Sequence, residues 1–326
     1  MKKPQTGRDL KPAAIPVAVI GMGLMGSSIA ACLLASGHRV TGVTRSAGRA
    51  RTARQRIREF LVEMRREGLL RGTVAAAIQR LTVTRRYADL AGVALVVESS
   101  IEDEATKHRI FRKLEKVIPP AALIGSNTSA IPITRLQAGA RHPERIYGLH
   151  WAEPAHITRF LEIICGGRSA PAGAEWLQKL SAKWGKDPGL VRRDIRGFIA
   201  NRCMYAMFRE AFHLVESGVC TIEDVDRSVS NDMGWWLTFA GPFRFMDLTG
   251  LSLYYSVMRD LSPELNNAKT APRMLAALAK AGARGTTNGH GFYPYTKASA
   301  RAWDKAFEKF SYDVRRLAGK HRKVRM

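Results

Sequence analysis

The stretch IPVAVIGMGLMGSSIAACLLASG, residues 15–37, decides the fold of this chain. Its first six residues are mostly apolar and partly β-branched, as in a buried strand, and they lead directly into the pattern G-x-G-x-x-G. Gly21 permits a tight turn, Gly23 lets the backbone approach a pyrophosphate, and Gly26 lets the following helix pack closely on the strand. Strand, glycine turn and helix in this order predict a dinucleotide-binding βαβ unit, because the helix N-terminus attracts phosphates. The turn residues expected to hold the cofactor are Gly21, Gly23, Leu24, Met25 and Gly26.

The next strand bears on which dinucleotide is bound. Gly37 ends the helix, and residues 39–43 are expected to form the second strand. In NAD-binding units this strand ends on an acid that binds the ribose 2′-hydroxyl, but here Thr44 and Arg45 stand at that place. Without the carboxylate nothing repels a 2′-phosphate, and Arg45 could bind one by charge-assisted hydrogen bonds. The pattern favours NADP over NAD, unless Arg45 only stacks on the adenine.

The rest of the chain predicts two kinds of domain. Apolar residues recur at helical spacing from Arg51 to about Leu81, with arginines on the opposite face, which predicts a basic helical arm inserted between strands. Strands are expected again at 95–98, 123–125 and 190–191, and beyond about 193–196 only helical patterns remain. The expected fold class is α/β, an N-terminal Rossmann-type doubly wound sheet followed by an all-α C-terminal domain. The expected parts are a disordered basic leader (1–14), a dinucleotide-binding domain (15–194), a helical domain (195–312) and a basic C-terminal tail (313–326).

The segment RIYGLHWAEPAHITRFLEII, residues 145–164, carries the candidate chemistry. An apolar strand delivers His150 to its end, a loop turns the chain, and a second apolar run carries Glu162. A histidine and a carboxylate on neighbouring segments can form a base and the partner that orients it. The same two residue types also form packed, hydrogen-bonded pairs without a catalytic role, so the pair alone is not decisive.

Composition and length indicate a globular protein with room for two domains. Of the 326 residues 46% are hydrophobic and 25% are charged, and no apolar run approaches the roughly 20 residues of a membrane span. The basic N-terminus lacks the apolar middle of a signal peptide. Because no metal-ligand spacing joins the four cysteines, we expect no metal site and a reducing, cytoplasmic location. These cysteines are Cys32, Cys165, Cys203 and Cys220.

The net charge of +24, from 52 basic and 28 acidic residues, is unusual. The excess is concentrated between residues 45 and 86 and in the last residues of the chain. Such a balance favours polyanionic partners such as nucleic acid, acidic membranes or phosphorylated small molecules. However, the basic stretches carry few aromatic residues and match no zinc-finger, RRM or homeodomain pattern, so we do not expect nucleic acid as a partner. A solvated basic surface is the alternative interpretation.

Seven motifs follow one another in a specific order and resemble the 3-hydroxyacyl-CoA dehydrogenase family over nearly the whole chain. They are GMGLMG, VVES followed by Glu102 and Lys107, SNTS, GLH with LEII, GFIANR, GPFRFMD and GHGFYPY. The resemblance implies a Rossmann domain that binds NAD and a helical domain that contributes to the substrate site and forms a homodimer. It also implies an enzyme that oxidises a secondary alcohol next to an activated carbonyl, with a small-molecule substrate that could be a CoA thioester.

The resemblance also implies roles for individual residues. His150 would remove the hydroxyl proton while hydride leaves to the nicotinamide, and Glu162 would hold His150 and stabilise its charged form. Two further residues, Ser129 and Asn201, would bind the substrate's oxygens. Three others, Glu102, Lys107 and Asn127, would line the nicotinamide-ribose side of the cofactor.

Several departures from the family pattern leave the substrate open. The family usually has Asn in its H-F-x-N-P loop, where this chain has Glu153, an acid where it has Thr44, and Met-Pro-Leu where it has residues 158–160. The candidates for substrate selectivity are Glu153, Arg159, Trp235 and Trp236. Glu153 and Arg159 could simply pair with each other.

Two alternatives to an acyl-CoA substrate therefore stay open. The first is a small hydroxy acid or ring alcohol, as in the related carnitine, gulonate and pyridoxine-pathway dehydrogenases. The second is a binding protein without turnover, like the crystallin relatives of the family. The joint presence of His150, Glu162, Ser129 and Asn201 argues against the second.

Overall fold

A computed structural model describes residues 10–321 and divides the chain into two compact units, up to Asn201 and from Arg202 onward. The first unit is built on one eight-stranded sheet with the order β3-β2-β1-β4-β5-β6-β7-β8. All neighbouring strands are parallel except β6 and β7, which are antiparallel. The strands are β1 (Val17–Ile20), β2 (Val40–Val43), β3 (Leu81–Thr84), β4 (Leu95–Glu98), β5 (Leu123–Ser126), β6 (Ile146–Trp151), β7 (Leu161–Cys165) and β8 (Gly189–Val191).

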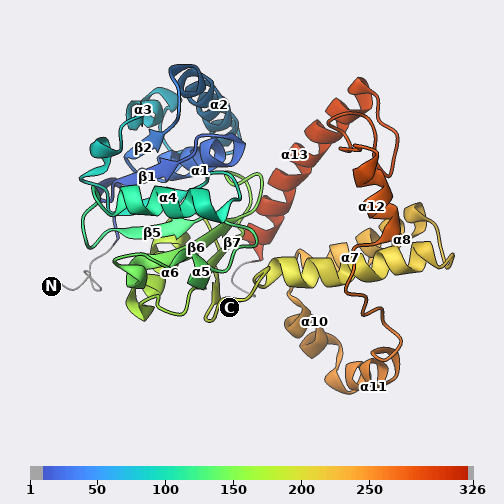
Figure 1. The fold of residues 1–326 in the computed structure, drawn as a ribbon. Helices are drawn as coiled ribbons and strands as arrows, with labels where there is room; N and C mark the ends of the chain where they lie inside the picture. The colour runs from blue at the N-terminus through green and yellow to red at the C-terminus, as the bar shows by residue number, and fades with distance from the viewer. Residues whose placement is uncertain (1–9, 322–326) are drawn as a thin grey trace. The chain divides into compact units, whose positions relative to one another are not determined.

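Helices cover both faces of this sheet, which confirms the predicted doubly wound architecture (Figure 1). One core lies between the sheet and α1, α2, α3 and α6, and the other lies between the sheet and α4 and α5. The strands β1 and β4 are buried along their whole length, as expected of central parallel strands covered on both faces. The helices are α1 (Leu24–Ala35), α2 (Ala47–Arg66), α3 (Val74–Gln79), α4 (Glu104–Leu114), α5 (Ile133–Leu136) and α6 (Pro171–Lys183), with 3-10 turns at Pro12–Ala14, Tyr87–Leu90 and Pro143–Arg145.

The segment expected as a helical arm differs from the prediction at both ends. Its first helix, α2, begins at Ala47, where the Ser46 side chain accepts a hydrogen bond from the N–H of Arg49. Its second helix, α3, ends at Gln79, and Leu81 begins the strand β3 where we expected helix. The reason is that LTVT is rich in β-branched residues and pairs with β2 in parallel.

The second unit contains only helices among its described residues, which confirms the prediction of an all-α C-terminal domain. The longest helices of this unit are its first and its last. Within residues 10–321 of the whole chain, no helix combines the length and the apolar character that a membrane span requires. The helices are α7 (Ala200–Glu216, which begins in the first unit), α8 (Ile222–Asn231), α9 (Met233–Leu237), α10 (Pro242–Thr249), α11 (Leu251–Leu261), α12 (Arg273–Lys280) and α13 (Lys297–Lys320).

The predicted leader and tail are only partly covered. Residues 1–9 of the leader and 322–326 of the tail lie outside the described residues. Of the remainder, Pro12–Ala14 form a 3-10 turn, and residues 313–320 continue the helix α13.

Candidate active site

The glycine turn between β1 and α1 provides the space that a dinucleotide's phosphates require. Gly21 has a φ of 91°, and a Cβ there would clash with the backbone carbonyl of Ser99. A Cβ on Gly26 would clash with the carbonyl oxygen of Gly21, since α1 approaches the turn closely. At Gly23, by contrast, no described residue apart from its chain neighbours comes within 4 Å of an added Cβ. Because Gly23 caps α1 at the end with free N–H groups, the residues present fit a bound pyrophosphate.

The second strand ends without an acid beside this turn. Thr44 follows β2, is buried, and donates its backbone N–H to the carbonyl oxygen of Thr84 at 3.0 Å. Arg45 is exposed and lies close enough to Tyr87 for its charge to influence the pKa of the phenol. Burial raises the pKa of Tyr87, the negative charge of Glu98 raises it further, and the positive charge of Arg45 lowers it. The end of β2 therefore carries a threonine followed by an exposed arginine, and no carboxylate.

The predicted pair His150 and Glu162 is brought together on the antiparallel strands β6 and β7. The two residues are direct partners in the register, and His150 Nδ1 lies 2.9 Å from Glu162 Oε2. Both side chains are buried, with the rings of Phe160 and Phe198 packed at centroid distances of 5.4 and 5.5 Å from the imidazole. An ionised carboxylate only accepts hydrogen bonds, so it holds the proton on Nδ1 and leaves the lone pair of Nε2 available. Such a ring can accept a proton through Nε2.

The second oxygen of Glu162 is held by the start of α7. Glu162 Oε1 accepts hydrogen bonds from the backbone N–H groups of Ile199 and Ala200, at 3.1 and 2.9 Å. Gly197 and Phe198 precede them with φ angles of 82° and 53°, and the second value is rare for a bulky residue. This left-handed turn aims the free N–H groups at the start of α7 at the carboxylate of Glu162. Phe198 was not among the predicted site residues, because a sequence does not reveal a strained backbone at a residue other than glycine.

Two of the polar residues predicted from the motifs, Asn127 and Ser129, lie in the loop after β5, and a third, Asn201, lies in the first turn of α7. Asn127 accepts a hydrogen bond from the backbone N–H of Trp151 at 3.0 Å and donates one to Ser99 Oγ at 3.2 Å. Asn201 donates from Nδ2 to the carbonyl oxygen of Ser129 at 2.9 Å. The structure therefore brings Ser129 and Asn201 together, while Asn127 fixes the backbone immediately after His150.

Glu102 organises the loop that carries Ser129. Its Oε1 accepts from the Thr128 hydroxyl and from the backbone N–H groups of Ser129 and Ala130, at 2.5, 2.9 and 3.1 Å. Burial disfavours the charged form of Glu102, but these hydrogen bonds and the nearby Lys107 outweigh it, so the pKa of Glu102 is lowered. Glu102 thus carries a negative charge at neutral pH and holds the loop in one conformation.

Lys107 is fully buried in an ion pair with a residue that the sequence analysis did not assign. Its Nζ lies 2.8 Å from Glu98 Oε2 and 3.5 Å from Glu102 Oε2. The same oxygen of Glu98 accepts from the Ser126 hydroxyl at 2.7 Å. This network places Lys107 beneath the loops as a support for Glu98 and Glu102. The signal for Glu98 was present in the sequence, since it is the acid of the VVES motif at the end of a predicted strand.

Glu153 and Arg159, two of the candidates for substrate selectivity, do not form an ion pair with each other in the described part of the chain. Arg159 donates to Asp187 at 3.0 Å, and among the described residues no ion pair joins Arg159 to Glu153. The alternative that Glu153 and Arg159 neutralise each other is therefore wrong, and Glu153 is exposed. Trp235 and Trp236 belong to the helical unit, where Trp236 stacks on Phe245 with a centroid distance of 4.2 Å and Trp235 is exposed.

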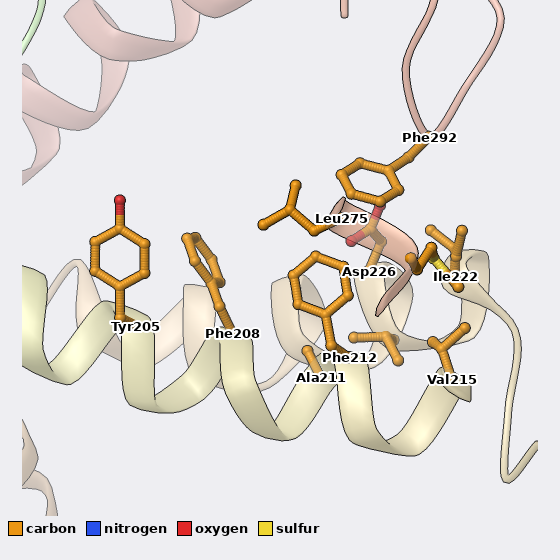
Figure 2. A pocket seen from close by; sticks show the side chains of 11 residues that line it. Tyr205, Phe208, Ala211, Phe212, Val215, Ile222, Asp226, Leu275 and Phe292 are labelled. Atoms are coloured by element: carbon orange, nitrogen blue, oxygen red, sulfur yellow. The ribbon is translucent and has the colours of Figure 1, made fainter. Parts of the chain in front are cut away.

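The helical unit contains an apolar pocket with a volume of about 330 Å³ (Figure 2). Tyr205, Phe208 and Phe212 of α7 line it together with Leu275 and Phe292. Asp226 at its edge accepts a hydrogen bond from Tyr293 at 2.7 Å, which raises the pKa of that phenol to about 12. None of these residues was predicted as part of a site, because an apolar face on a helix normally indicates packing against the protein core.

Comparisons with known proteins cover almost the whole chain. The model of the 3-hydroxyacyl-CoA dehydrogenase NAD binding domain matches residues 16–195, and that of the C-terminal domain of the same family matches residues 197–295. The chain is 33% identical over 302 residues to 5-formyl-3-hydroxy-2-methylpyridine 4-carboxylate 5-dehydrogenase of Mesorhizobium japonicum, covering 92% of this chain and 97% of that protein. It is 32% identical over 284 residues to 3-hydroxybutyryl-CoA dehydrogenase of Bradyrhizobium diazoefficiens, covering 86% and 96%.

Solved structures give the same relationships. A crystal structure of the pyridine-carboxylate 5-dehydrogenase, described as an NAD+ dependent dismutase, has a TM-score of 0.87 and 31% identity, covering 93% of this chain and 98% of that one. The (S)-3-hydroxybutyryl-CoA dehydrogenase of Ralstonia eutropha has a TM-score of 0.72 and 27% identity, covering 86% and 99%.

Proposed function

The chain belongs to the 3-hydroxyacyl-CoA dehydrogenase family, and we propose that His150 is the general base of its hydride-transfer reaction. As a member of this family it is a nicotinamide-dependent dehydrogenase that acts on CH–OH groups. The observation that carries the proposal is the 2.9 Å contact between His150 Nδ1 and Glu162 Oε2. It leaves His150 Nε2 as a proton acceptor of fixed orientation.

In the proposed reaction, different residues of this chain accept the proton, stabilise the resulting charge and bind the substrate oxygens. Bound at the glycine turn, the nicotinamide cofactor supplies the hydride acceptor. His150 takes the hydroxyl proton through Nε2, the carbon gives up its hydride, and the C–O bond becomes a carbonyl. Glu162 stabilises the imidazolium that forms, because its own charge is held by the N–H groups of Ile199 and Ala200. Ser129 and Asn201, joined by their hydrogen bond, would hold the substrate oxygens in line with the acceptor.

For the substrate we propose a small hydroxylated or aldehyde-bearing ring acid rather than a CoA thioester. The support is the similarity to the pyridine-carboxylate dehydrogenase, which extends over 93% of this chain with a TM-score of 0.87. A hydrated aldehyde carries a hydroxyl group and a hydrogen on the same carbon, so His150 can perform the same step on it. The exposed Glu153 in the loop after His150, where acyl-CoA members usually have Asn, also favours a different substrate.

A 3-hydroxyacyl-CoA is the second candidate. Several relatives, including those of Bradyrhizobium diazoefficiens and Clostridioides difficile, are named 3-hydroxybutyryl-CoA dehydrogenases, at 32% and 28% identity. The net charge of +24 also suits the phosphates of CoA. The two candidates differ in whether the CoA portion contributes to binding.

The deciding experiment follows the nicotinamide absorbance with both substrate classes and both cofactors. The probes are 5-formyl-3-hydroxy-2-methylpyridine 4-carboxylate and acetoacetyl-CoA, each with NAD(H) and NADP(H). We expect kcat/KM to be at least about tenfold higher with the ring aldehyde, a difference of about 1.4 kcal/mol. A higher kcat/KM with acetoacetyl-CoA would favour the second candidate.

The cofactor choice between NAD and NADP follows from the end of β2. The matching family model describes an NAD binding domain, so NAD is the cofactor that the family predicts. We propose that the chain also accepts NADP, because Thr44 does not repel a 2′-phosphate and Arg45 is exposed beside it.

We also propose that the helical unit forms a homodimer. Large apolar side chains of this unit are exposed in the single chain at a density that is unusual for a monomer surface. Burying them against a second copy would remove this surface from water. Light scattering after gel filtration measures the mass directly, and a monomer at micromolar concentration would contradict the proposal. The side chains with more than half of their surface exposed include Tyr205, Trp235, Phe243, Leu248, Tyr255, Trp303, Phe307 and Phe310.

A further inference from the structure

The loop between His150 and Glu162 is fastened to the cofactor helix by a buried serine and histidine. Ser28 lies on α1, two residues after the last glycine of the turn, and both Ser28 and His156 are buried. Ser28 Oγ lies 2.8 Å from His156 Nδ1, and the backbone N–H of His156 donates to the same oxygen at 3.0 Å. Two hydrogen bonds therefore join one oxygen of α1 to one residue of the loop.

The imidazole of His156 contacts two helices of the first unit. The Ser28 oxygen accepts from the backbone N–H and also lies within hydrogen-bond distance of Nδ1, so one atom of α1 contacts both the main chain and the side chain of His156. The other ring nitrogen, Nε2, lies 3.5 Å from Glu63 Oε2 of α2. Phe60, also on α2, stacks on the ring with a centroid distance of 4.2 Å and an angle of 24°. His156 is thus held from α1 and α2 at once.

A buried lysine fixes the same loop from the other side. Lys186 donates from Nζ to the carbonyl oxygens of Ala155, at 2.6 Å, and of Thr158. The ammonium also lies 4.8 Å from the ring centroid of Trp151, the residue that follows His150. The loop is consequently clamped at both flanks of His156, so a shift of His156 would be transmitted to the strands β6 and β7.

We infer that Ser28 and His156 are positioning residues that set the His150–Glu162 pair relative to the cofactor. The N-terminus of α1 would hold the pyrophosphate of the cofactor, and the loop joins the two strands that carry the pair. Hydride transfer depends on the position of the substrate carbon between these two parts, and a misplacement of about 1 Å can cost on the order of a hundredfold in rate. This inference rests on the proposed role of His150.

The test compares Ser28→Ala and His156→Leu with wild type at saturating cofactor, using the better of the ring aldehyde and acetoacetyl-CoA. We expect kcat to fall by about tenfold or more in both variants. The acid limb of the pH–rate profile should stay in place, because the hydrogen bond between His150 and Glu162 is intact. His156→Asn, which keeps a hydrogen-bonding group near the position of Nδ1, should recover kcat to within about threefold of wild type. Ser36→Ala is the matched control, since Ser36 lies just past the other end of α1 and its hydroxyl donates to the carbonyl oxygen of Cys32.

A purely structural role would give a different result. In that case the variants would lose thermal stability, but kcat per folded molecule, counted by cofactor titration, would stay within twofold of wild type and overturn the inference. If His156→Leu does not fold, Ser28→Ala decides alone, because it removes a single oxygen atom. His150→Gln is assayed in parallel. Retained activity in that variant would refute the proposed function itself, whereas lost activity there with normal kcat in Ser28→Ala would refute only the positioning role.

Discussion

His150 and Glu162 face each other across the antiparallel strands β6 and β7, with His150 Nδ1 2.9 Å from Glu162 Oε2. The separation of the two side chains is therefore set by the backbone register of the sheet. The carboxylate is in turn fixed by two N–H groups at the start of α7. An imidazole held in this way needs no rearrangement before it accepts a proton.

We predict that His150→Gln cuts turnover by about 10²–10⁴, the usual contribution of a positioned general base. Glutamine can hydrogen bond to Glu162 but cannot accept the proton near neutral pH. Cofactor binding, measured by fluorescence titration, should stay within a few-fold of wild type, because the glycine turn is unchanged. Turnover within a few-fold of wild type would remove His150 from the mechanism.

We predict that Glu162→Gln reduces turnover less than His150→Gln, by about 10- to 1,000-fold. The N–H groups of Ile199 and Ala200 would keep an oxygen on their side, so the new amide would donate to His150. This stabilises the imidazole tautomer with its proton on Nε2, which cannot act as the base. In addition, the remaining activity should persist to lower pH, because the imidazolium loses its counter-charge. An unchanged pH–rate profile would mean that Glu162 serves only the structure.

The central part of the fold and of the site could be predicted because its signals are local. The strand, the glycine turn and α1 follow one another without interruption in the sequence, and His150 and Glu162 sit at corresponding positions of two adjacent strands. The roles of Gly21 and Gly26 could be predicted from the residue type alone, since only glycine avoids the backbone clashes at these points.

The contacts that could not be predicted join segments far apart in the chain. Arg159 pairs with Asp187, 28 residues away, and not with the nearer Glu153. Ser28 meets His156 across 128 residues. Local periodicity contains no information on such pairs, because they depend on how loops cross the edge of the sheet. The strand at Leu81 was missed for a related reason, since four residues after a helix give too short a pattern to distinguish it.

Thr44→Asp should shift the cofactor preference towards NADH by about tenfold or more. A carboxylate at the end of β2 repels a 2′-phosphate and accepts a hydrogen bond from a ribose hydroxyl. The measurement is the ratio of kcat/KM for NADH and NADPH. Arg54→Ala, on α2, is the control, because it makes the net charge more negative by the same amount at another position. If wild type already prefers NADH by tenfold, Arg45 is not a phosphate ligand.

Below about pH 6.5 we predict a loss of stability that depends on His38. His38 is buried, its Nδ1 faces the carbonyl oxygen of Ile15 at 2.8 Å, and its Nε2 accepts from Trp184 Nε1 at 2.7 Å. Burial lowers the pKa of His38, although its hydrogen bonds to the Ile15 and Pro12 carbonyls raise it in part. Protonation would also place a second N–H against that of Trp184.

The sign of this effect follows from the lowered pKa. Below about pH 6.5 the unfolded chain binds a proton on His38 and the folded chain does not, so acid favours unfolding. The free energy of unfolding should fall by up to about 1.4 kcal/mol per pH unit until the folded pKa is reached. Urea midpoints at pH 7.5, 6.5 and 5.5 measure the slope, which should be shallower in His38→Phe and unchanged in the exposed-site control His142→Gln. Equal slopes in all three proteins would contradict the assignment.

The exposed Glu153 should decide which substrate class is accepted. An ionised Glu only accepts hydrogen bonds, whereas an Asn, usual here in acyl-CoA members of the family, donates and accepts. Arg159 pairs with Asp187, and Glu153 is exposed to solvent three residues after His150. If the substrate is a ring alcohol or aldehyde that binds this carboxylate, Glu153→Asn should cost about 1.5–3 kcal/mol in its kcat/KM and leave acetoacetyl-CoA unaffected or improved. Glu175→Gln, an exposed acid on α6, is the control. Parallel losses with both substrates would show that Glu153 supports the loop and does not select the substrate.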